Sequence, residues 1–349
     1  MSSPYIRRAQ RPDGAARRTI RLAQRAAGAA ESTLRGVTAP LARRGFPYRT
    51  PTVPRSVEVP TEPSRLGGEY DTEWARSPLA RTARGLIVEG PLRLGVRVLA
   101  SPTVRGTDRL ADLARSVGDD ESAPPLIFAP NHHSHLDTGL MIRSIPAIWR
   151  RELVVAAAAD YFFDARWKAA LSALSLNAIP IDREVTGRAT SDRLRDAIAD
   201  GHSLIIYPEG GRSPDGWGQD FKGGAAYLST RTGAPVVPVF IDGTGEIYGK
   251  GADRLRPGRT TVTFGSPLSV AEGENTRRFN ARIEAAVARL GDETLHDFWE
   301  ASRRAASGTS TSLAGPDHTS WRRSWQLSDR RRLSTAGVRR RRRRAWPDL

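Results

Sequence analysis

Residues 131–137, Asn-His-His-Ser-His-Leu-Asp, contain the densest group of reactive side chains in the sequence. Four residues separate His132 from Asp137. On a straight helix those five positions turn through about 500°, which leaves the two side chains about 140° apart. They can meet only if His132 lies on a loop and Asp137 in the first turn of the following helix. Asp137 would then fix the tautomer of His132, and the imidazole could take a proton from a substrate hydroxyl.

Two other interpretations of this segment stay open at this point. His133, His135 and Asp137 are spaced like the start of the metallo-β-lactamase signature, which predicts a metallo-hydrolase. Alternatively, Ser134 or Asn131 caps the following helix, and the imidazoles have no chemical role.

A second group, Tyr-Pro-Glu-Gly-Gly-Arg-Ser at residues 207–213, also follows an apolar run. Gly210 and Gly211 free the backbone to approach a ligand. Arg212 carries a planar guanidinium suited to phosphate. Glu209 is a candidate ligand for a glycerol hydroxyl, or it orients Arg212. Taken alone, this segment is more typical of a surface turn with an ion pair.

Two further segments lie at strand-like positions. Arg183 comes just after the short apolar run 178–181, and residues 234–239 form an apolar run with a proline inside it. A proline at that point, Pro238, predicts an edge strand or a bulge, because proline cannot donate a hydrogen bond to a neighbouring strand.

Taken in order, these four segments resemble the glycerolipid acyltransferase family, the lysophosphatidate acyltransferase-like (PlsC-like) enzymes. Residues 131–137 match its first motif, Asn-His-x-Ser-x-x-Asp, throughout. Residues 207–213 match its third motif, Phe-Pro-Glu-Gly-Thr-Arg-Ser, with Tyr207 in place of Phe and Gly211 in place of Thr. Residues 234–239 match the fourth, an apolar run with proline before the final Val or Ile. The resemblance covers about residues 85–290.

The second motif of the family is the weakest match. Arg183 keeps the place of the family arginine, whereas Asn177 stands where Gly is usual and Pro180 where an aromatic or aliphatic residue is usual. Family arginines in the second and third motifs bind the acceptor phosphate, so these departures concern the acceptor.

The resemblance implies a 1-acylglycerol-3-phosphate O-acyltransferase-like enzyme. Such an enzyme moves a fatty acyl group from acyl-CoA or an acyl-carrier protein to a glycerolipid hydroxyl, converting lysophosphatidic acid or a related lysophospholipid. It implies no metal and no cofactor beyond the thioester co-substrate. The implied roles are base (His132), orienting carboxylate (Asp137), acceptor and substrate binding (Arg183, Glu209, Gly210, Gly211, Arg212) and shaping of the first loop (Asn131, Ser134).

Short apolar runs alternate with helical patterns from residue 124 onward, which predicts an α/β fold with a mixed, largely parallel sheet flanked by helices. The expected strands are 126–129, 153–158, 178–181, 204–207, 236–241 and 260–264. The expected helices are 138–150, 161–175, 191–199, 223–232 and 276–290, preceded by two short amphipathic helices in 79–99 that break at Gly90–Pro91.

The net charge of +16 comes from the two ends of the chain. Residues 1–70 carry +8 and 301–349 carry +10, while 71–300 carry −2. We therefore expect a Pro-rich, mostly disordered segment 1–70, an acyltransferase domain 71–300 and an Arg-rich disordered tail 301–349. A non-catalytic protein that binds nucleic acid through these ends is a further alternative.

No apolar stretch in the chain has the length and composition of a signal peptide or a transmembrane helix. The lipid acceptor implied by the family resemblance nevertheless resides in bilayers. We expect a cytoplasmic, peripherally membrane-associated protein that meets an anionic surface through residues 79–99 and the basic ends.

Overall fold

A computed structural model describes residues 70–115, 123–181, 188–213, 216–310 and 313–315. Most of the two basic ends, 1–69 and 316–349, and the predicted phosphate ligand Arg183 lie outside these described residues. The interpretations that rest on them therefore stay predictions.

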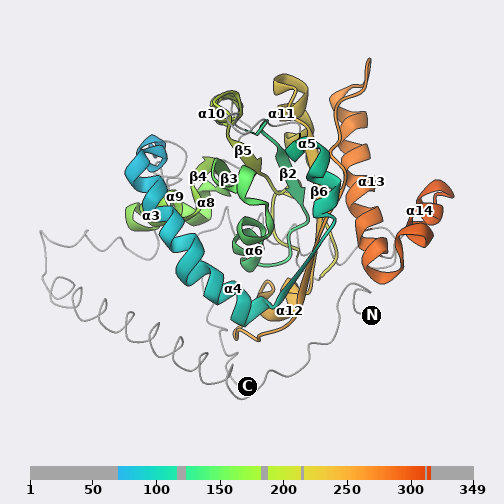
Figure 1. Ribbon diagram of the computed structural model, residues 1–349, viewed down its shortest axis with the longest axis horizontal. Coiled ribbons are helices and arrows are strands. Elements are labelled where there is room, and N and C mark those ends of the chain that lie inside the picture. The colour runs from blue at the N-terminus through green and yellow to red at the C-terminus, as the bar shows by residue number, and fades with distance from the viewer. Residues whose placement is uncertain (1–69, 116–122, 182–187, 214–215, 311–312, 316–349) are drawn as a thin grey trace, which may run out of the picture. The chain divides into compact units, whose positions relative to one another are not determined.

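One sheet of seven strands forms the centre of the described region (Figure 1). Its spatial order is β1-β7-β6-β2-β5-β3-β4, in which β4, β3, β5, β2 and β6 run parallel. Strand β7 is antiparallel to β6, and β1 is parallel to β7. The predicted mixed, largely parallel α/β sheet is confirmed. The strands are β1 (Pro102–Arg105), β2 (Ile127–Pro130), β3 (Leu153–Ala158), β4 (Ala178–Ile181), β5 (Ser203–Ile205), β6 (Val236–Asp242) and β7 (Thr260–Phe264).

Helices cover both faces of this sheet, which is why its strands read as continuous apolar runs. The helices of the first half are η1 (Glu73–Arg76), α3 (Pro78–Ile87), η2 (Val88–Leu92), α4 (Arg93–Ala100), η3 (Thr107–Leu110), α5 (Ala111–Arg115), α6 (Leu136–Ser144), α7 (Ala147–Arg150), α8 (Ala159–Phe162) and α9 (Arg166–Leu176). Those of the second half are α10 (Arg188–Ala199), α11 (Gly224–Thr232), α12 (Thr244–Tyr248), α13 (Thr276–Leu295) and α14 (Phe298–Ala306).

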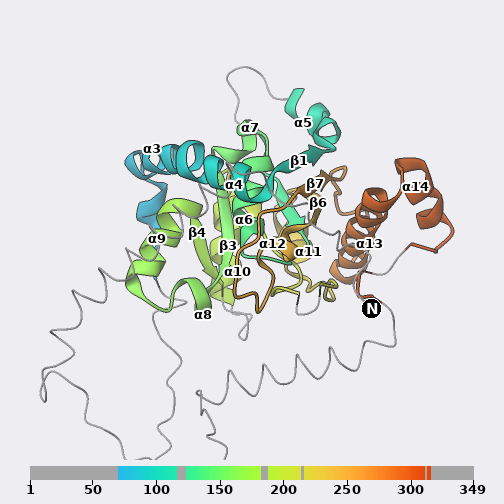
Figure 2. The same cartoon turned by 90° about the horizontal axis from the view of Figure 1, so that it is seen from below.

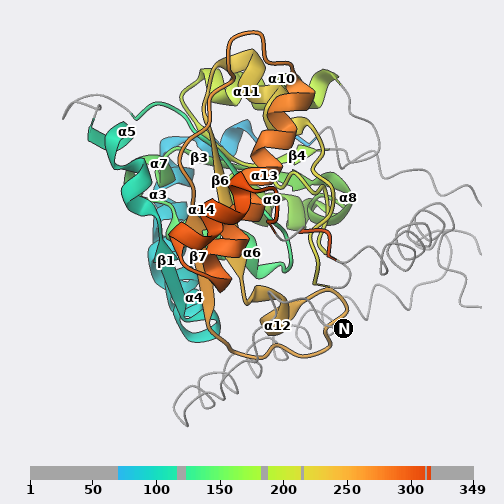
Figure 3. The same ribbon diagram turned by 90° about the vertical axis from the view of Figure 1, so that its right-hand side faces the viewer.

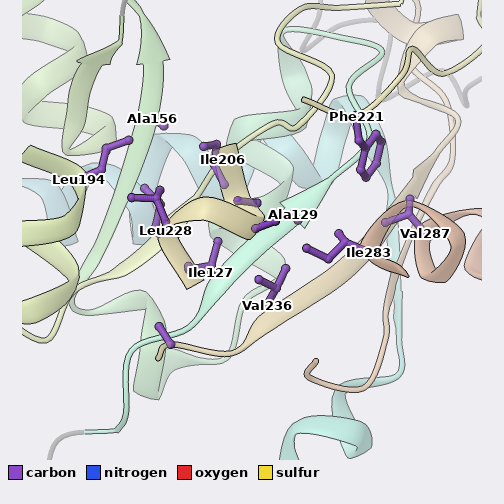
Figure 4. Packing of buried hydrophobic residues seen from close by; sticks show 14 of the residues in the cluster. Ile127, Ala129, Ala156, Leu194, Ile206, Phe221, Leu228, Val236, Ile283 and Val287 are labelled. Atoms are coloured by element: carbon purple, nitrogen blue, oxygen red, sulfur yellow. The ribbon is translucent and has the colours of Figure 1, made fainter. Parts of the chain in front are cut away.

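Alternate residues of each central strand enter two separate cores, because successive strand side chains point to opposite faces. Ile127 and Ala129 of β2 pack with α10, α11 and α13, including Leu228 and Ile283 (Figure 4). Phe128 of β2 faces the opposite core, with η2, α6 and α7. Helix α13 runs along the sheet with α14 packed against it (Figure 3). The sheet is thus held rigidly between two helical layers.

The N-terminal helices form one bent helical segment where a break at Gly90–Pro91 was predicted (Figure 1). Helix α3 begins at Pro78 after Ser77, whose Oγ accepts a hydrogen bond from the backbone N–H of Ala80. The chain then passes through a π-helical turn, η2, into α4, with helical backbone angles throughout. A wider turn accommodates Pro91, which lacks an N–H and would collide with a carbonyl in a regular helix.

Several other element boundaries differ from expectation. The helix predicted over 161–175 is two helices, α8 and α9, and the one predicted over 138–150 is α6 and α7. Strand β1 was not predicted at all. Helix α14 and the buried side chain of Leu313 carry the folded region past the boundary expected at residue 300.

Strand β6 lies between β2 and β7, so the expectation of an edge strand at Pro238 is wrong and that of a bulge is correct. Val239 pairs with Phe264 but Val236 pairs with Leu268, so the partner segment has one residue more. The missing N–H of Pro238 falls where the regular pairing of β7 has ended.

Candidate active site

The segments 131–137 and 207–213 meet at the carboxyl edge of the parallel strands. The first follows β2 and the second follows β5, and these strands are neighbours in the sheet. In an open parallel sheet, ligands bind at this edge, outside the carboxyl ends of the strands. The loop after β6, which leads into α12, joins them because β6 lies on the other side of β2.

His132 and Asp137 form the predicted pair. His132 Nδ1 lies 2.8 Å from Asp137 Oδ2. His132 is on the loop, and Asp137 is in the first turn of α6, as the spacing required. Because Nδ1 is engaged with the carboxylate, Nε2 is the ring nitrogen left for a substrate, and His132 lines a cavity. The arrangement suits proton abstraction from a hydroxyl.

The carboxylate of Asp137 is completely buried, with 0% exposure, and the loop wraps around it. Besides His132, the backbone N–H groups of His133 and Ser134 donate to Oδ2, at 2.7 and 2.8 Å. Burial alone would raise the pKa of Asp137, but the hydrogen bond and charge of His132, the Ser134 N–H and the Thr244 hydroxyl together hold that pKa below its ordinary value. Asp137 is therefore ionised at neutral pH.

Glu209 is buried and hydrogen-bonds to the backbone of the His132 loop. It is 2% exposed; its Oε1 accepts a hydrogen bond from the backbone N–H of His132 at 2.8 Å, and its Oε2 one from Gln219 N–H at 2.9 Å. The predicted substrate ligand thus faces backbone, and it is not among the described residues that line the cavity. Ser213 N–H donates to the carbonyl of His132 at 2.8 Å. The segment 207–213 therefore binds both the N–H and the carbonyl of His132.

Asn131 and Ser134 shape the loop, as predicted, through contacts with distant backbone. The Asn131 side chain donates to the carbonyl of Ile241 at 2.9 Å and accepts from its N–H at 2.6 Å. Ser134 Oγ donates to the carbonyl of Tyr248 at 2.7 Å and accepts from Leu136 N–H at 3.2 Å. The loop is therefore fastened both to β6 and to α12.

Tyr207 is a site residue whose role the sequence did not indicate. Its ring stacks on the His132 imidazole, with centroids 4.0 Å apart and an interplanar angle of 24°. Its hydroxyl lies 3.0 Å from Thr138 Oγ1. Burial and the Asp137 charge raise the pKa of Tyr207 well above its ordinary value, against the effect of the Thr138 bond, so the phenol stays protonated. The only sequence signal was the tyrosine at a position where the family motif has phenylalanine.

A cavity of about 140 Å³ opens in front of His132. Apolar side chains of β3 and α8 line one part of it, and the polar part is lined by His132, His135, Thr138, Tyr207, Gly210, Gly211, Arg212 and Lys250. Arg212 and His132 thus line the same cavity. Gly210 has φ +66°, a conformation that favours glycine, and its N–H donates to the carbonyl of Tyr207 at 3.0 Å. The Gly210 N–H is therefore already bonded within the turn. The Gly211 N–H is the better candidate to donate a hydrogen bond to a ligand in the cavity.

A second, largely apolar cavity of about 480 Å³ lies beside the first, between α4 and α6. The two share His135, Thr138, Phe162 and Leu176 in their linings. Gly139 lets η2 approach α6 closely, because a Cβ there would lie 3.0 Å from the Leu92 side chain. This second cavity thus adjoins the His132 cavity on the side of the N-terminal helices, and we call it the apolar passage.

His133 and His135, which the metal interpretation would require as ligands, make other contacts. His135 packs edge-on against Phe162 and near Tyr248, and His133 N–H binds Asp137. Across the described ranges, no group of three or more His, Cys, Asp or Glu side chains is arranged to hold a metal ion. The geometry therefore does not favour a metallo-hydrolase.

Within the part of the chain that the structure describes, no helix combines the length and apolar character needed to cross a bilayer.

Comparison with known proteins gives relatives of one kind. The chain is 28% identical to the 1-acyl-sn-glycerol-3-phosphate acyltransferase of Cocos nucifera over 169 residues, which are 46% of this chain and 51% of that protein. It is 30% identical to the alpha form of that enzyme from Mus musculus over 153 residues, 42% of this chain and 50% of that protein. The chain thus spans about half the length of these curated relatives.

The chain is also similar to the crystal structure of the 1-acyl-sn-glycerophosphate acyltransferase PlsC from Thermotoga maritima. The TM-score is 0.46 at 22% identity, covering 62% of this chain and 84% of that one.

A family model described as "Acyltransferase" matches residues 102–242, from β1 to the end of β6. That range contains all four motifs and both residues of the His132–Asp137 pair. Residues 102–242 are therefore similar to the acyltransferase family, in agreement with the resemblance predicted from the motifs.

Proposed function

We propose that this chain is an O-acyltransferase that moves a fatty acyl group from a thioester to the free hydroxyl of a 1-acylglycerol 3-phosphate or a related lysophospholipid. The observation that carries the proposal is the His132–Asp137 pair, 2.8 Å apart, with the second imidazole nitrogen left free toward a cavity that also contains Arg212. The names of the relatives support the same acceptor.

In the proposed reaction, His132 Nε2 takes the proton of the acceptor hydroxyl as the hydroxyl oxygen attacks the thioester carbonyl carbon. Asp137 stabilises the imidazolium that forms. The tetrahedral intermediate carries its negative charge on the former carbonyl oxygen, near the Gly211 N–H. The carbon–sulfur bond then breaks, and the thiolate takes the proton from His132. No metal, redox group or covalent enzyme intermediate takes part in these steps.

The cavity next to the base suits the acceptor head, and the apolar passage suits an acyl chain. Arg212 offers two parallel N–H donors to a phosphate. The passage between α4 and α6 is lined by Leu92, Val96 and Leu99 among others and meets the first cavity at Phe162. We propose acyl-CoA or an acyl-carrier protein as the thioester donor.

We further propose that the protein acts as a peripheral protein on the cytoplasmic face of an anionic membrane, which it contacts through α3, α4 and α9. Leu79 and Leu86 are seven positions apart, within about 20° of each other around the helix, and are 81% and 72% exposed. Trp167 and Leu171 of α9 are exposed as well, at 65% and 56%. Helix α9 lies beside α3 (Figure 2), joined by Arg84 Nε to the carbonyl of Leu174 at 3.0 Å.

The test of the proposed function is thiol release from acyl-CoA in the presence of 1-acylglycerol 3-phosphate, comparing wild type with His132→Ala. General-base catalysis contributes about 10²–10⁴-fold, so the variant should lose at least a hundredfold in kcat while it remains folded at the assay temperature. Near-wild-type transfer by a folded His132→Ala protein would show that the base is elsewhere.

A further inference from the structure

Lys250 lies at the rim of the His132 cavity, on a segment to which none of the sequence motifs assigns a role. It comes just after α12 and lines the cavity together with Arg212. Among the described residues of this lining, the permanently charged side chains are these two cations. The carboxylates of Asp137 and Glu209 are buried behind the loop. A cavity lined by two cations and no carboxylate favours an anionic ligand.

Backbone contacts fix the Lys250 segment to the loop of the base. Ser134 and Gly249 form an isolated antiparallel bridge, and Ser134 Oγ donates to the carbonyl of Tyr248 at 2.7 Å. A Cβ at Gly249 would lie 2.4 Å from the backbone oxygen of Gly245, so glycine alone permits this close turn. Lys250 directly follows Gly249, the residue that pairs with the His132 loop. Its backbone is therefore held beside that loop.

We propose that Lys250, with Arg212, binds the phosphate of the acyl acceptor and thereby selects acceptors that carry one; this inference rests on the proposed acyl transfer. The free hydroxyl and the phosphate ester of a 1-acylglycerol 3-phosphate are on adjacent carbons. When the hydroxyl reaches His132 Nε2, the phosphate must lie in the same small cavity. The phosphates of acyl-CoA are separated from its thioester by the whole pantetheine arm, so they fall outside it.

The two cations would act differently. The Arg212 guanidinium can bind two phosphate oxygens in one plane, whereas the Lys250 ammonium is a compact point charge on a flexible stem. Lys250 at the rim can therefore follow the phosphate as the acceptor enters, while the proton transfer at His132 does not involve it. Its loss should weaken acceptor binding and leave the chemical step intact.

The variant Lys250→Gln tests this with two acceptors, 1-acylglycerol 3-phosphate and the phosphate-free monoacylglycerol. Hydrogen bonds to charged groups contribute enough to binding that KM for the phosphate acceptor should rise about ten- to a hundredfold. The kcat, the KM for acyl-CoA and the rate with monoacylglycerol should stay within about twofold. Lys250→Arg should recover part of the affinity. Arg231→Gln is the control, because Arg231 is an exposed cation on α11 that packs over the Tyr227 ring and does not line the cavity.

An unchanged KM for the phosphate acceptor would overturn the proposal, and so would a rise in the KM for acyl-CoA or an equal rise for both acceptors. Equilibrium binding of 1-acylglycerol 3-phosphate to the His132→Ala protein, with and without Lys250→Gln, separates this result from the proposed function. If wild type transferred no acyl group, the proposed function would fail. The binding comparison would still decide whether Lys250 holds phosphate, with a tenfold or larger rise in Kd expected.

Discussion

Replacement of Asp137 by asparagine isolates the charge of the candidate dyad from its geometry. Asp137 Oδ2 accepts hydrogen bonds from His132 Nδ1 and from the N–H groups of His133 and Ser134. The amide oxygen of asparagine can accept the same three bonds, so the loop and the imidazole tautomer can be kept. What the variant loses is the negative charge that faces the imidazolium during proton transfer.

The magnitude follows from the distance. With Nδ1 and Oδ2 2.8 Å apart, the centres of the two charged groups are about 4 Å apart, and unit charges at that separation attract by about 4 kcal/mol at an effective dielectric of about 20. In the proposed reaction the imidazolium forms as His132 takes the proton of the acceptor, so this energy is lost mainly from the transition state. We therefore expect kcat to fall by about a thousandfold, with KM for the acceptor changed little.

The assay is acyl transfer under saturating donor and acceptor, with thermal unfolding measured in parallel. Asp292→Asn is the control, because Asp292 on α13 is equally buried and lies outside the candidate site. It should leave kcat unchanged. A folded Asp137→Asn protein that loses less than tenfold in kcat would refute the electrostatic role given to Asp137.

The pH dependence of stability provides a second readout of the same variant. The folded-state pKa of Asp137 is lowered, so its contribution to stability is present above the unfolded pKa of about 4 and is lost as pH falls through the folded value. The unfolding temperatures of wild type and Asp137→Asn should therefore differ at neutral pH and converge in acid.

Two further predictions concern the surroundings of the dyad and the exposed apolar surface. Tyr207→Phe keeps the ring on His132 and loses one neutral hydrogen bond, worth about 1 kcal/mol, so kcat should stay within about tenfold; Tyr207→Leu should be several-fold slower than Tyr207→Phe, and equal rates would show that the stacking does not position the imidazole. Leu86 and Leu94 are 72% and 58% exposed, and Leu86→Glu with Leu94→Glu should reduce flotation with anionic vesicles, since burial of each leucine in the membrane contributes about 1.5–3 kcal/mol. Thr230→Glu with Arg231→Gln on α11 makes the same change of net charge elsewhere and should float like wild type.

The dyad could be predicted from the sequence because its geometry is local. The four-residue gap between His132 and Asp137 allows contact only across a loop and a first helical turn, and the strand before and the helix after were both visible as patterns. Strands β3, β4 and β7 were predicted at their observed bounds, because their apolar runs end at polar or helix-forming residues. Such features depend on neighbouring residues and need no knowledge of strand order.

The remaining contacts depend on strand order, which the sequence does not specify. Glu209 binds the backbone of His132 because β5 lies beside β2, and Lys250 reaches the cavity because β6 lies on the other side of β2. Pro238 was expected at an edge because a proline usually ends pairing there. The bulge opposite Pro238 leaves no partner carbonyl that needs the missing N–H. This bulge is visible only in the register of β6 with β7.

The motif residues fall into two groups once the contacts are known. Asn131, Ser134 and Glu209 bind backbone atoms of β6, α12 and the His132 loop, and so they hold the loop in place. These hydrogen bonds do not depend on which side chains the partner residues carry. The departures in the third motif, Tyr207 and Gly211, line the cavity, whereas those in the second motif, Asn177 and Pro180, are buried at the end of α9 and in β4 and do not line it. The contacts that hold the loop are therefore made by residues that match the motifs, while the two departures in the third motif lie at the cavity, where we expect them to affect which acceptor and acyl chain are bound.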